Sequence, residues 1–118
     1  MAGSTTNARV RAHFEGDSPY TATDSPANGA DTVVGETTRT HVVVADGTNT
    51  VDLSSAAAEG REVTIVHNGG ANTPTVSFAD ADFVGTGPSN MTSAGATATV
   101  KNIDGTTSGW VVVSTGSA

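Results

Sequence analysis

Residues 51–113 form two halves with the same local plan, and this plan restricts the possible folds more than any other feature of the chain. Each half contains a short β-forming run, a turn with glycine and then a stronger β-forming run. Valine and threonine, whose branched side chains favour strands, account for 15 and 20 of the 118 residues. The stretch therefore predicts a folded all-β domain.

Short runs with strand character, separated by turn residues, continue through most of the chain. The clearest are residues 39–45, 48–53, 62–67, 74–78, 96–101 and 110–114, with one more at 9–14. Asp46-Gly47 and Asp104-Gly105 are strong turn signals, and turns recur about every ten residues. This spacing predicts a small antiparallel β-sandwich or barrel of about seven or eight short strands.

Alternation along these runs predicts which side chains face inward. In residues 39–45, Val42 and Val44 share one face, and His41 and Val43 share the other. Further along the chain, the inward positions are assigned to Val63, Ile65, Val76 and Phe78. Residues 54–60 place serines, alanines and a glycine in the order expected for one helical turn.

The first third of the chain carries little periodicity, which predicts an extended N-terminal arm (1–37) followed by the β domain (38–118). Phe14 and Tyr20 are the only large apolar side chains of this arm. They either anchor the arm in a groove on another surface or cap the core of the domain itself. Together with Arg9 and Arg11, they are the residues expected to contact a partner.

The chain carries a net charge of −7, with 12 acidic and 5 basic residues. This balance argues against nucleic-acid binding, which needs clustered lysine and arginine. A single lysine and an excess of aspartate are typical of salt-adapted proteins, whose surface acids retain hydration when salt screens other interactions. An ordinary acidic surface is the alternative. No disulfide can form because cysteine is absent, and a small domain without such links often depends on oligomerisation.

Neither a membrane span nor a secretory signal peptide is expected. No apolar run reaches 18 residues, and the first six residues lack an apolar segment.

No catalytic residue, cofactor site or metal site is predicted. The spacing of His13, His41 and His67 matches no metal motif, so His41 and His67 are expected to face solvent or a subunit contact. Asp80 and Asp82 would share one strand face as solvated surface carboxylates, and calcium binding is the less favoured alternative.

Two further residues have a possible role at the surface. Asn90 begins an N-x-[ST] sequon, which is a potential glycosylation site. Trp110 is either a half-buried strand residue or part of an interface or ligand platform. The subunit-interface residues assigned from the sequence are His41, Val43 and Trp110.

Two groups of residues resemble a module of tailed-virus structural proteins. The first is Gly60-Arg61 followed by the run Val63-Thr64-Ile65-Val66-His67-Asn68-Gly69-Gly70, and the second is Asp104-Gly105 followed by Gly109-Trp110-Val111-Val112-Val113. The resemblance covers about residues 40–114. The chain departs from it in two extra residues, Thr107 and Ser108, and in residues 83–87, which replace the usual middle turn.

The resemblance implies a virion surface part of the kind found in head decoration proteins, head fibres and tail fibres, commonly trimeric and without enzymatic activity. With the salt-adapted composition, the expected setting is a virus of a halophilic, archaeal host. The hypothesis is a capsid decoration protein, made in the host cytoplasm, that binds the major capsid protein as a homotrimer. A tail-fibre or receptor-binding subunit, a carbohydrate-binding module and a small trimeric β-barrel hydrolase are the alternatives.

Overall fold

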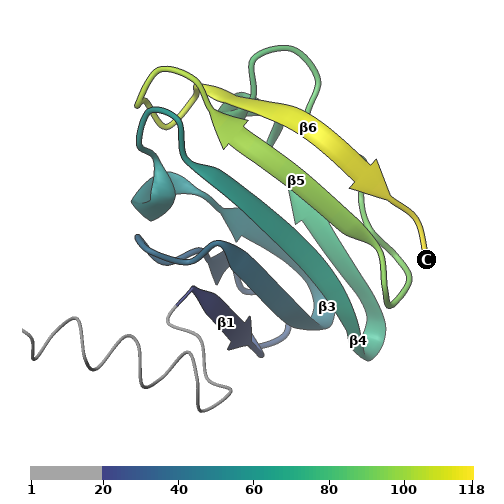
Figure 1. Cartoon of the computed structure of the whole chain (residues 1–118). Helices are drawn as coiled ribbons and strands as arrows, with labels where there is room; N and C mark the ends of the chain where they lie inside the picture. The colour runs from purple at the N-terminus through teal and green to yellow at the C-terminus, as the bar shows by residue number, and fades with distance from the viewer. Residues whose placement is uncertain (1–19) are drawn as a thin grey trace, which may run out of the picture.

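The computed structural model describes residues 20–118 as a nearly all-β structure, which confirms the predicted fold class (Figure 1). In chain order the elements are β1 (Thr21–Asp24), β2 (Thr32–Val33), β3 (Thr40–Asp52), the 3₁₀ turn η1 (Ser54–Ala56), β4 (Glu62–Phe78), the 3₁₀ turn η2 (Asp80–Asp82), β5 (Thr97–Asn102) and β6 (Trp110–Gly116). Arg9, Arg11, Phe14 and the predicted strand at 9–14 lie outside the described residues.

The strands join into one sheet in the order β1-β3-β4-β5-β6, with β2 also paired to β3. The first three pairings, β1 with β3, β2 with β3 and β3 with β4, are parallel. Only β4 with β5 and β5 with β6 are antiparallel. The expectation of a purely antiparallel arrangement is therefore corrected to a mixed sheet.

The parallel pairings arise because the chain coils past itself. Thr21 pairs with Thr40, and Thr32 pairs with Val51. The sequence separation of the two partners is the same in both pairs, so β1 and β2 lie along β3 in one common register. In the next turn of the coil β3 runs beside β4 over nearly its whole length. Register shifts between Val43 and Ala45 and between Asp46 and Thr48 mark the place where both long strands bend.

The described residues form six strands, and this bend is one reason why the number differs from the predicted seven or eight. The predicted runs 39–45 and 48–53 are the two halves of β3, and 62–67 and 74–78 are the two halves of β4. The Asp46-Gly47 turn is present, with Gly47 at φ 66°, but it turns one continuous strand instead of ending it. Figure 1 shows β3 and β4 folding back on themselves, so that each contributes to two layers.

The core lies between these layers. The first halves of β3 and β4 contribute Val43, Ala45, Val63 and Ile65, and the second halves contribute Val51 and Val76, all at most 1% exposed. The inward positions of Val63, Ile65 and Val76 are as predicted, whereas Phe78 is only partly buried against this core. Trp110 from β6, Val100 from β5, Leu53 and Val34 are also at most 1% exposed, and Phe83 and Met91 are buried at the edge of the core.

The part of the predicted arm that the structure describes, residues 20–37, belongs to the β domain. β1 and β2 hydrogen-bond to β3, and Thr32 and Val34 are fully buried. Asn49, which is also fully buried, holds the loop between β1 and β2: its Nδ2 donates to the carbonyls of Ala27 and Ala30. Strands of four and two residues carry too little alternation to be recognised in the sequence, so the pattern there does not distinguish them from an extended arm.

Two local predictions concern the 3₁₀ turns. The helical turn expected within residues 54–60 is present as η1. Asp80 and Asp82, expected on one strand face, lie instead in η2, where the chain leaves β4.

Candidate functional site

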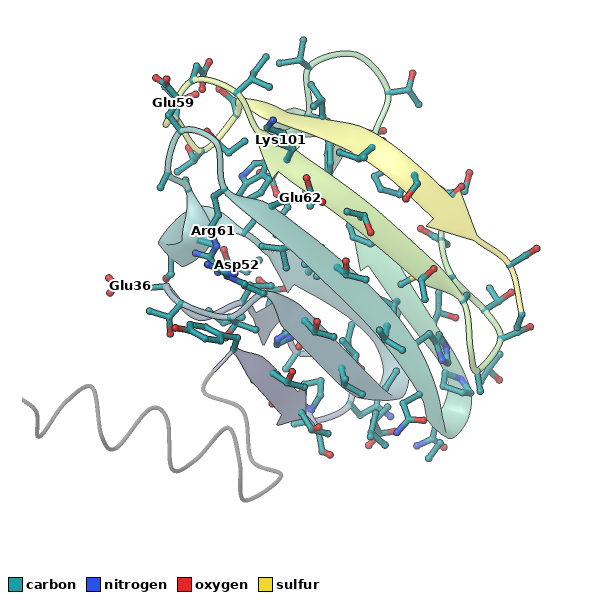
Figure 2. All side chains as sticks on the ribbon, viewed as in Figure 1. Glu36, Asp52, Glu59, Arg61, Glu62 and Lys101 are labelled. Carbon is teal, nitrogen blue, oxygen red and sulfur yellow. The ribbon has the colours of Figure 1, made fainter. Side chains whose placement is uncertain are left out.

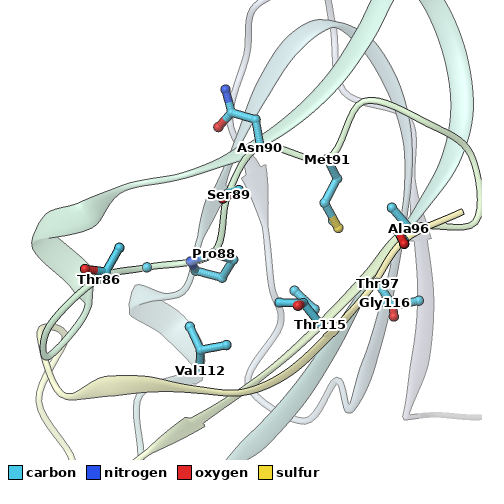
Figure 3. Close-up of a pocket in the computed structure, with 13 residues that line it drawn as sticks. Thr86, Pro88, Ser89, Asn90, Met91, Ala96, Thr97, Val112, Thr115 and Gly116 are labelled. Atoms are coloured by element: carbon cyan, nitrogen blue, oxygen red, sulfur yellow. The ribbon is translucent and has the colours of Figure 1, made fainter.

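An open groove of about 550 Å³ lies between β6 and the segment that precedes β5 (Figure 3). One wall consists of residues 86–91, and the other comes from β6 and the start of β5. Met91 and Val112 point into the space between the walls, and Ala98 and Ala96 contribute to its buried floor. The groove therefore opens the core of the domain to solvent along one side.

The walls of this groove carry unused backbone hydrogen-bonding groups. Among the described residues, no backbone hydrogen bond involves residues 85–90, and pairing resumes only where Met91 meets Val76. On the opposite wall β6 is the last strand of the sheet, and beyond Trp110 none of the described residues pairs with its outer edge. Unpaired strand edges of this kind are templates for an added strand.

The chemistry of the groove is uniform: every lining residue is uncharged. Hydroxyl groups come from Thr86, Ser89, Thr97, Thr115 and Ser117, and the only amide is that of Asn90, which is exposed on the rim. No aromatic ring lines the groove. This lining favours a neutral occupant with small side chains or hydroxyl groups, and it contains no carboxylate, imidazole, amine or thiol.

The residues predicted to form a subunit interface lie inside the domain. His41 is 1% exposed, and Val43 and Trp110 are fully buried. Their side chains therefore cannot contact a second copy, and this corrects both the interface prediction and the expectation that His41 and His67 face solvent. His67 lies on the same strand face as Val63 and Ile65, so alternation places it inward with them.

The buried ring of His41 is part of a chain of hydrogen bonds within the domain. Its Nε2 lies 2.7 Å from Oγ1 of Thr32, which donates a 2.7 Å hydrogen bond to Oδ2 of Asp24. Burial lowers the pKa of His41, and the nearby Asp24 carboxylate partly opposes that shift. The second ring nitrogen, Nδ1, is buried without a hydrogen-bond partner, as is Nε1 of Trp110.

His67 is held in a similar way by backbone groups. Its Nε2 lies 3.0 Å from the carbonyl oxygen of Pro74, and its Nδ1 accepts a hydrogen bond from the N–H of Gly69. The side chain thus fixes the bend between the two halves of β4. Both histidines are structural members of the fold.

Tyr20 is the one predicted partner-contact residue that the structure describes. The guanidinium carbon of Arg39 lies 4.8 Å from the centre of its ring, a cation–π geometry. The carbonyl oxygen of Tyr20 accepts hydrogen bonds from the N–H groups of Arg39 and Thr40. Tyr20 therefore fastens the start of β1 to the start of β3.

The Gly60-Arg61 pair, central to the viral resemblance, has a structural role. The guanidinium of Arg61 donates to the backbone carbonyls of Gly35, Glu36 and Thr38, so it closes the loop before β3. Figure 2 shows Arg61 at the end of the sheet where β4 begins, near the loop that carries Glu36. Partial burial, with a contribution from Arg39, lowers the pKa of Arg61.

A smaller hollow of about 440 Å³ adjoins this clamp and is lined by Arg39, Arg61 and Glu62 with three small residues. Glu62 lies directly opposite Lys101 in the β4–β5 pairing, so side chains of both charges lie at the hollow. Because the fork of Arg61 is already occupied by carbonyls, this hollow offers little as an anion site.

The described residues contain no group of three or more histidines and acids that could hold a metal ion. Asp82 is the carboxylate with a raised pKa, caused by burial and then by the charge of Asp52. No helix among residues 20–118 is long and apolar enough to span a membrane.

No protein-family model matches the chain, and no curated protein matches it.

The groove was not foreseen from the sequence. Its lining comes from residues 86–91, 96–98 and 112–117, and only the observed strand order brings these three segments together. The one available signal was residues 85–90, where Gly-Thr-Gly-Pro-Ser-Asn has no strand pattern and still needs hydrogen-bond partners.

Proposed function

We propose that this protein is a virion structural protein that decorates the capsid surface, binding the major capsid protein as a homotrimer. The observation that carries the proposal is the combination of a rigid β domain with an open, uncharged groove bordered by two unpaired backbone edges. Such edges serve association between polypeptide chains.

The residues of the viral resemblance support the proposal because each has a definite structural task. Arg61 closes the loop before β3, and Trp110 is the largest fully buried side chain. The Asp104-Gly105 turn is held by Asn102, whose Oδ1 accepts from both N–H groups. These positions belong to the scaffold of the module, so contacts with a shell would be made by other surfaces.

One such surface is the solvent-facing side of the layer that β5 forms with the first halves of β3 and β4. Thr40, Thr64 and Thr99 lie opposite one another across β3, β4 and β5, and the hydroxyls of Thr64 and Thr99 are 2.9 Å apart. Val42 and Val44 are half-buried beside this row. A broad face of threonine and valine, without charge at its centre, suits close contact with another protein surface.

The acidic charge supports a setting of high salt. Arg9, Arg11, Glu15 and Asp17 cancel within residues 1–19, so the net charge of −7 belongs to the described domain. Repulsion among these acids weakens when salt shortens the screening length from about 10 Å at 0.1 M to about 3 Å at 1 M.

The proposal is tested by measuring mass with light scattering coupled to size exclusion, at 0.1 M and at molar salt, together with binding to purified capsids that lack the protein. A trimer that saturates capsid sites in a fixed ratio to the major capsid protein is expected. A monomer that ignores capsids at both salt concentrations would refute the proposal.

A receptor-binding or carbohydrate-binding role is the second candidate, and the hydroxyl-lined groove is the observation that favours it. A glycan array probed with the full chain separates the two. Binding to a defined glycan that is lost in Thr115→Arg, with no capsid binding, would establish this candidate in place of decoration.

A further inference from the structure

We propose that the groove between β6 and residues 85–91 receives residues 2–8 of a second copy of this chain as an added β-strand. The inference rests on the self-association proposed above and identifies the surface that carries it. Its occupant is a polypeptide backbone, because that is what the two walls can pair with.

The backbone of the groove supports this assignment. Residues 85–90 present five N–H groups, since only Pro88 lacks one, and none of them has a backbone partner among the described residues. The outer edge of β6 is equally unpaired beyond Trp110. A strand laid between the walls would pair with one or both edges and cover the buried floor at Met91 and Ala98.

The size of the groove limits the occupant to a short segment with small side chains. Its β6 wall runs from Val112 to Ser117, which at about 3.3 Å per residue corresponds to roughly 17 Å, or about five residues of extended chain. Glycines and alanines at positions 87, 96, 98 and 116 keep the walls and floor close to the backbone. Large side chains on the occupant would have no recess to enter.

The N-terminal segment fits these limits in chemistry. Residues 2–8 read Ala-Gly-Ser-Thr-Thr-Asn-Ala, which are all small or medium in size and all uncharged. The groove is uncharged as well, so neither partner would bury an unpaired charge. The arginines that follow, Arg9 and Arg11, would remain outside the groove and face a domain with net negative charge.

Length and position favour a second copy as the source. Residues 9–19, which link the segment to Tyr20, span at most about 40 Å when fully extended, against 46 Å for the longest axis of the molecule. The segment enters the fold at β1, which lies at the opposite edge of the sheet from β6. A contact from the β1 side of one copy to the β6 side of the next is head-to-tail, and such contacts close into rings such as trimers.

The chain has no cysteine, so single cysteines can report the contact. A variant with Thr5→Cys or Thr6→Cys is co-produced with a second variant carrying Thr115→Cys in the groove. Thr107→Cys, an exposed threonine in the turn before β6 and outside the groove, replaces Thr115→Cys as the matched control. Mild oxidation is followed by mass spectrometry of the disulfide-linked heterodimers.

The expected result is at least tenfold more heterodimer with Thr115→Cys than with Thr107→Cys. One of the two adjacent arm positions should react better than the other, because neighbouring residues of a strand face opposite sides. Equal yields at both acceptor positions would overturn the inference. So would a double variant that forms only an internal disulfide while the mixed single variants form none.

Light scattering on the same samples separates this inference from the proposed function. A trimer without the selective cross-link overturns the groove assignment and leaves self-association standing. A second variant tests the same point without cysteine: Thr5→Pro removes an N–H from the inserted strand and should weaken the trimer at least tenfold, whereas Thr107→Pro should not.

Discussion

Oγ1 of Thr32 lies 2.7 Å from Nε2 of His41, in the interior of the domain. The Thr32 hydroxyl has one hydrogen, and it is donated to the Asp24 carboxylate at 2.7 Å. His41 must therefore carry its proton on Nε2 and donate to Thr32. This chain of hydrogen bonds joins β1 and β2 to β3, so it ties two short strands to the long strand beside them.

Replacing Thr32 with valine keeps the shape of the side chain and removes the central hydroxyl. We expect Thr32→Val to lower the free energy of unfolding by about 1–3 kcal/mol, because the buried Nε2–H of His41 then has no acceptor. Thr23→Val, on the exposed face of β1, is the control and should change stability by less than about 0.5 kcal/mol. Urea unfolding measures both, and equal effects would contradict the role assigned to Thr32.

The same histidine predicts how stability depends on pH. Burial lowers the pKa of His41 below its ordinary value of 6.5, and Asp24 is the charged group that faces it and opposes the shift. The neutral form is thus favoured by folding, and the stabilisation is complete above pH 6.5 and declines as pH falls below that value. Hydrogen bonds from Ser54 and Thr106 lower the pKa of Asp52 and Asp104, so their contributions are lost only below about pH 4.

Urea midpoints of the wild type and of His41→Gln at pH 8, 7, 6 and 5 therefore separate the histidine effect from that of Asp82, whose pKa is raised. We expect stability to fall between pH 7 and pH 5 in the wild type, and His41→Gln to show a smaller slope over that range. A wild-type midpoint that stays constant from pH 8 to pH 5 would show that His41 accepts a proton without cost.

Arginine and lysine should not be interchangeable at position 61. Its planar fork reaches three backbone carbonyls, and a lysine in its place has one ammonium group that cannot span them. We expect Arg61→Lys and Arg61→Ala each to cost about 1–2 kcal/mol of unfolding free energy. Arg39→Lys is the matched control, since a lysine retains a cation above the Tyr20 ring, and it should cost less than about 0.5 kcal/mol. Comparable losses of unfolding free energy at positions 61 and 39 would contradict a specific role of the Arg61 guanidinium in closing the loop.

Local features of this fold could be predicted from the sequence because they depend on neighbouring residues. The alternation of His41 and Val43 against Val42 and Val44, the Asp104-Gly105 turn and the 3₁₀ turn near Ala56 are all set within a few positions. The direction in which two strands pair, in contrast, is not set by neighbouring residues. Whether β3 meets β4 in parallel depends on the coil as a whole, and nothing in the alternation of either strand encodes it.

Burial of polar residues was the other limit. Thr32, His41 and Asn49 are buried because partners distant in sequence satisfy their polar atoms. A sequence shows the polar atom but not its partner, so such residues are assigned to the surface. The groove escaped prediction for the same reason, since its walls come from three separate segments.

The effect of the Asp82 carboxylate on stability should depend on the salt concentration. Its pKa is raised by burial and by Asp52, so the carboxylate is disfavoured in the folded state at neutral pH. Asp82→Asn should therefore stabilise the protein slightly at 0.1 M salt, by less than about 0.5 kcal/mol, and the gain should shrink at 1 M as screening increases. Thermal unfolding at both salt concentrations checks this, with Asp80→Asn as the control. A gain that grows with salt would contradict the electrostatic origin.

Gly70 predicts the most damaging single substitution in the described chain. At φ 141° its backbone lies in a region that side chains rarely adopt, and a Cβ there would overlap the carbonyl of Ala45 in the neighbouring strand. That carbonyl belongs to the bend where β3 and β4 change layers, so it cannot move without disturbing the register on both sides. Gly70→Ala should therefore cost more than about 3 kcal/mol and strongly reduce the folded yield.

Gly85 supplies the matched comparison. It also has a positive φ, 81°, but nothing lies within 4 Å of an added Cβ, so only the backbone conformation opposes the change. We expect Gly85→Ala to cost about 1 kcal/mol by the same urea measurement. If the two variants were equally stable, the close approach of β4 to Ala45 could not be what holds the bend, and the coil of parallel strands would have to be stabilised elsewhere.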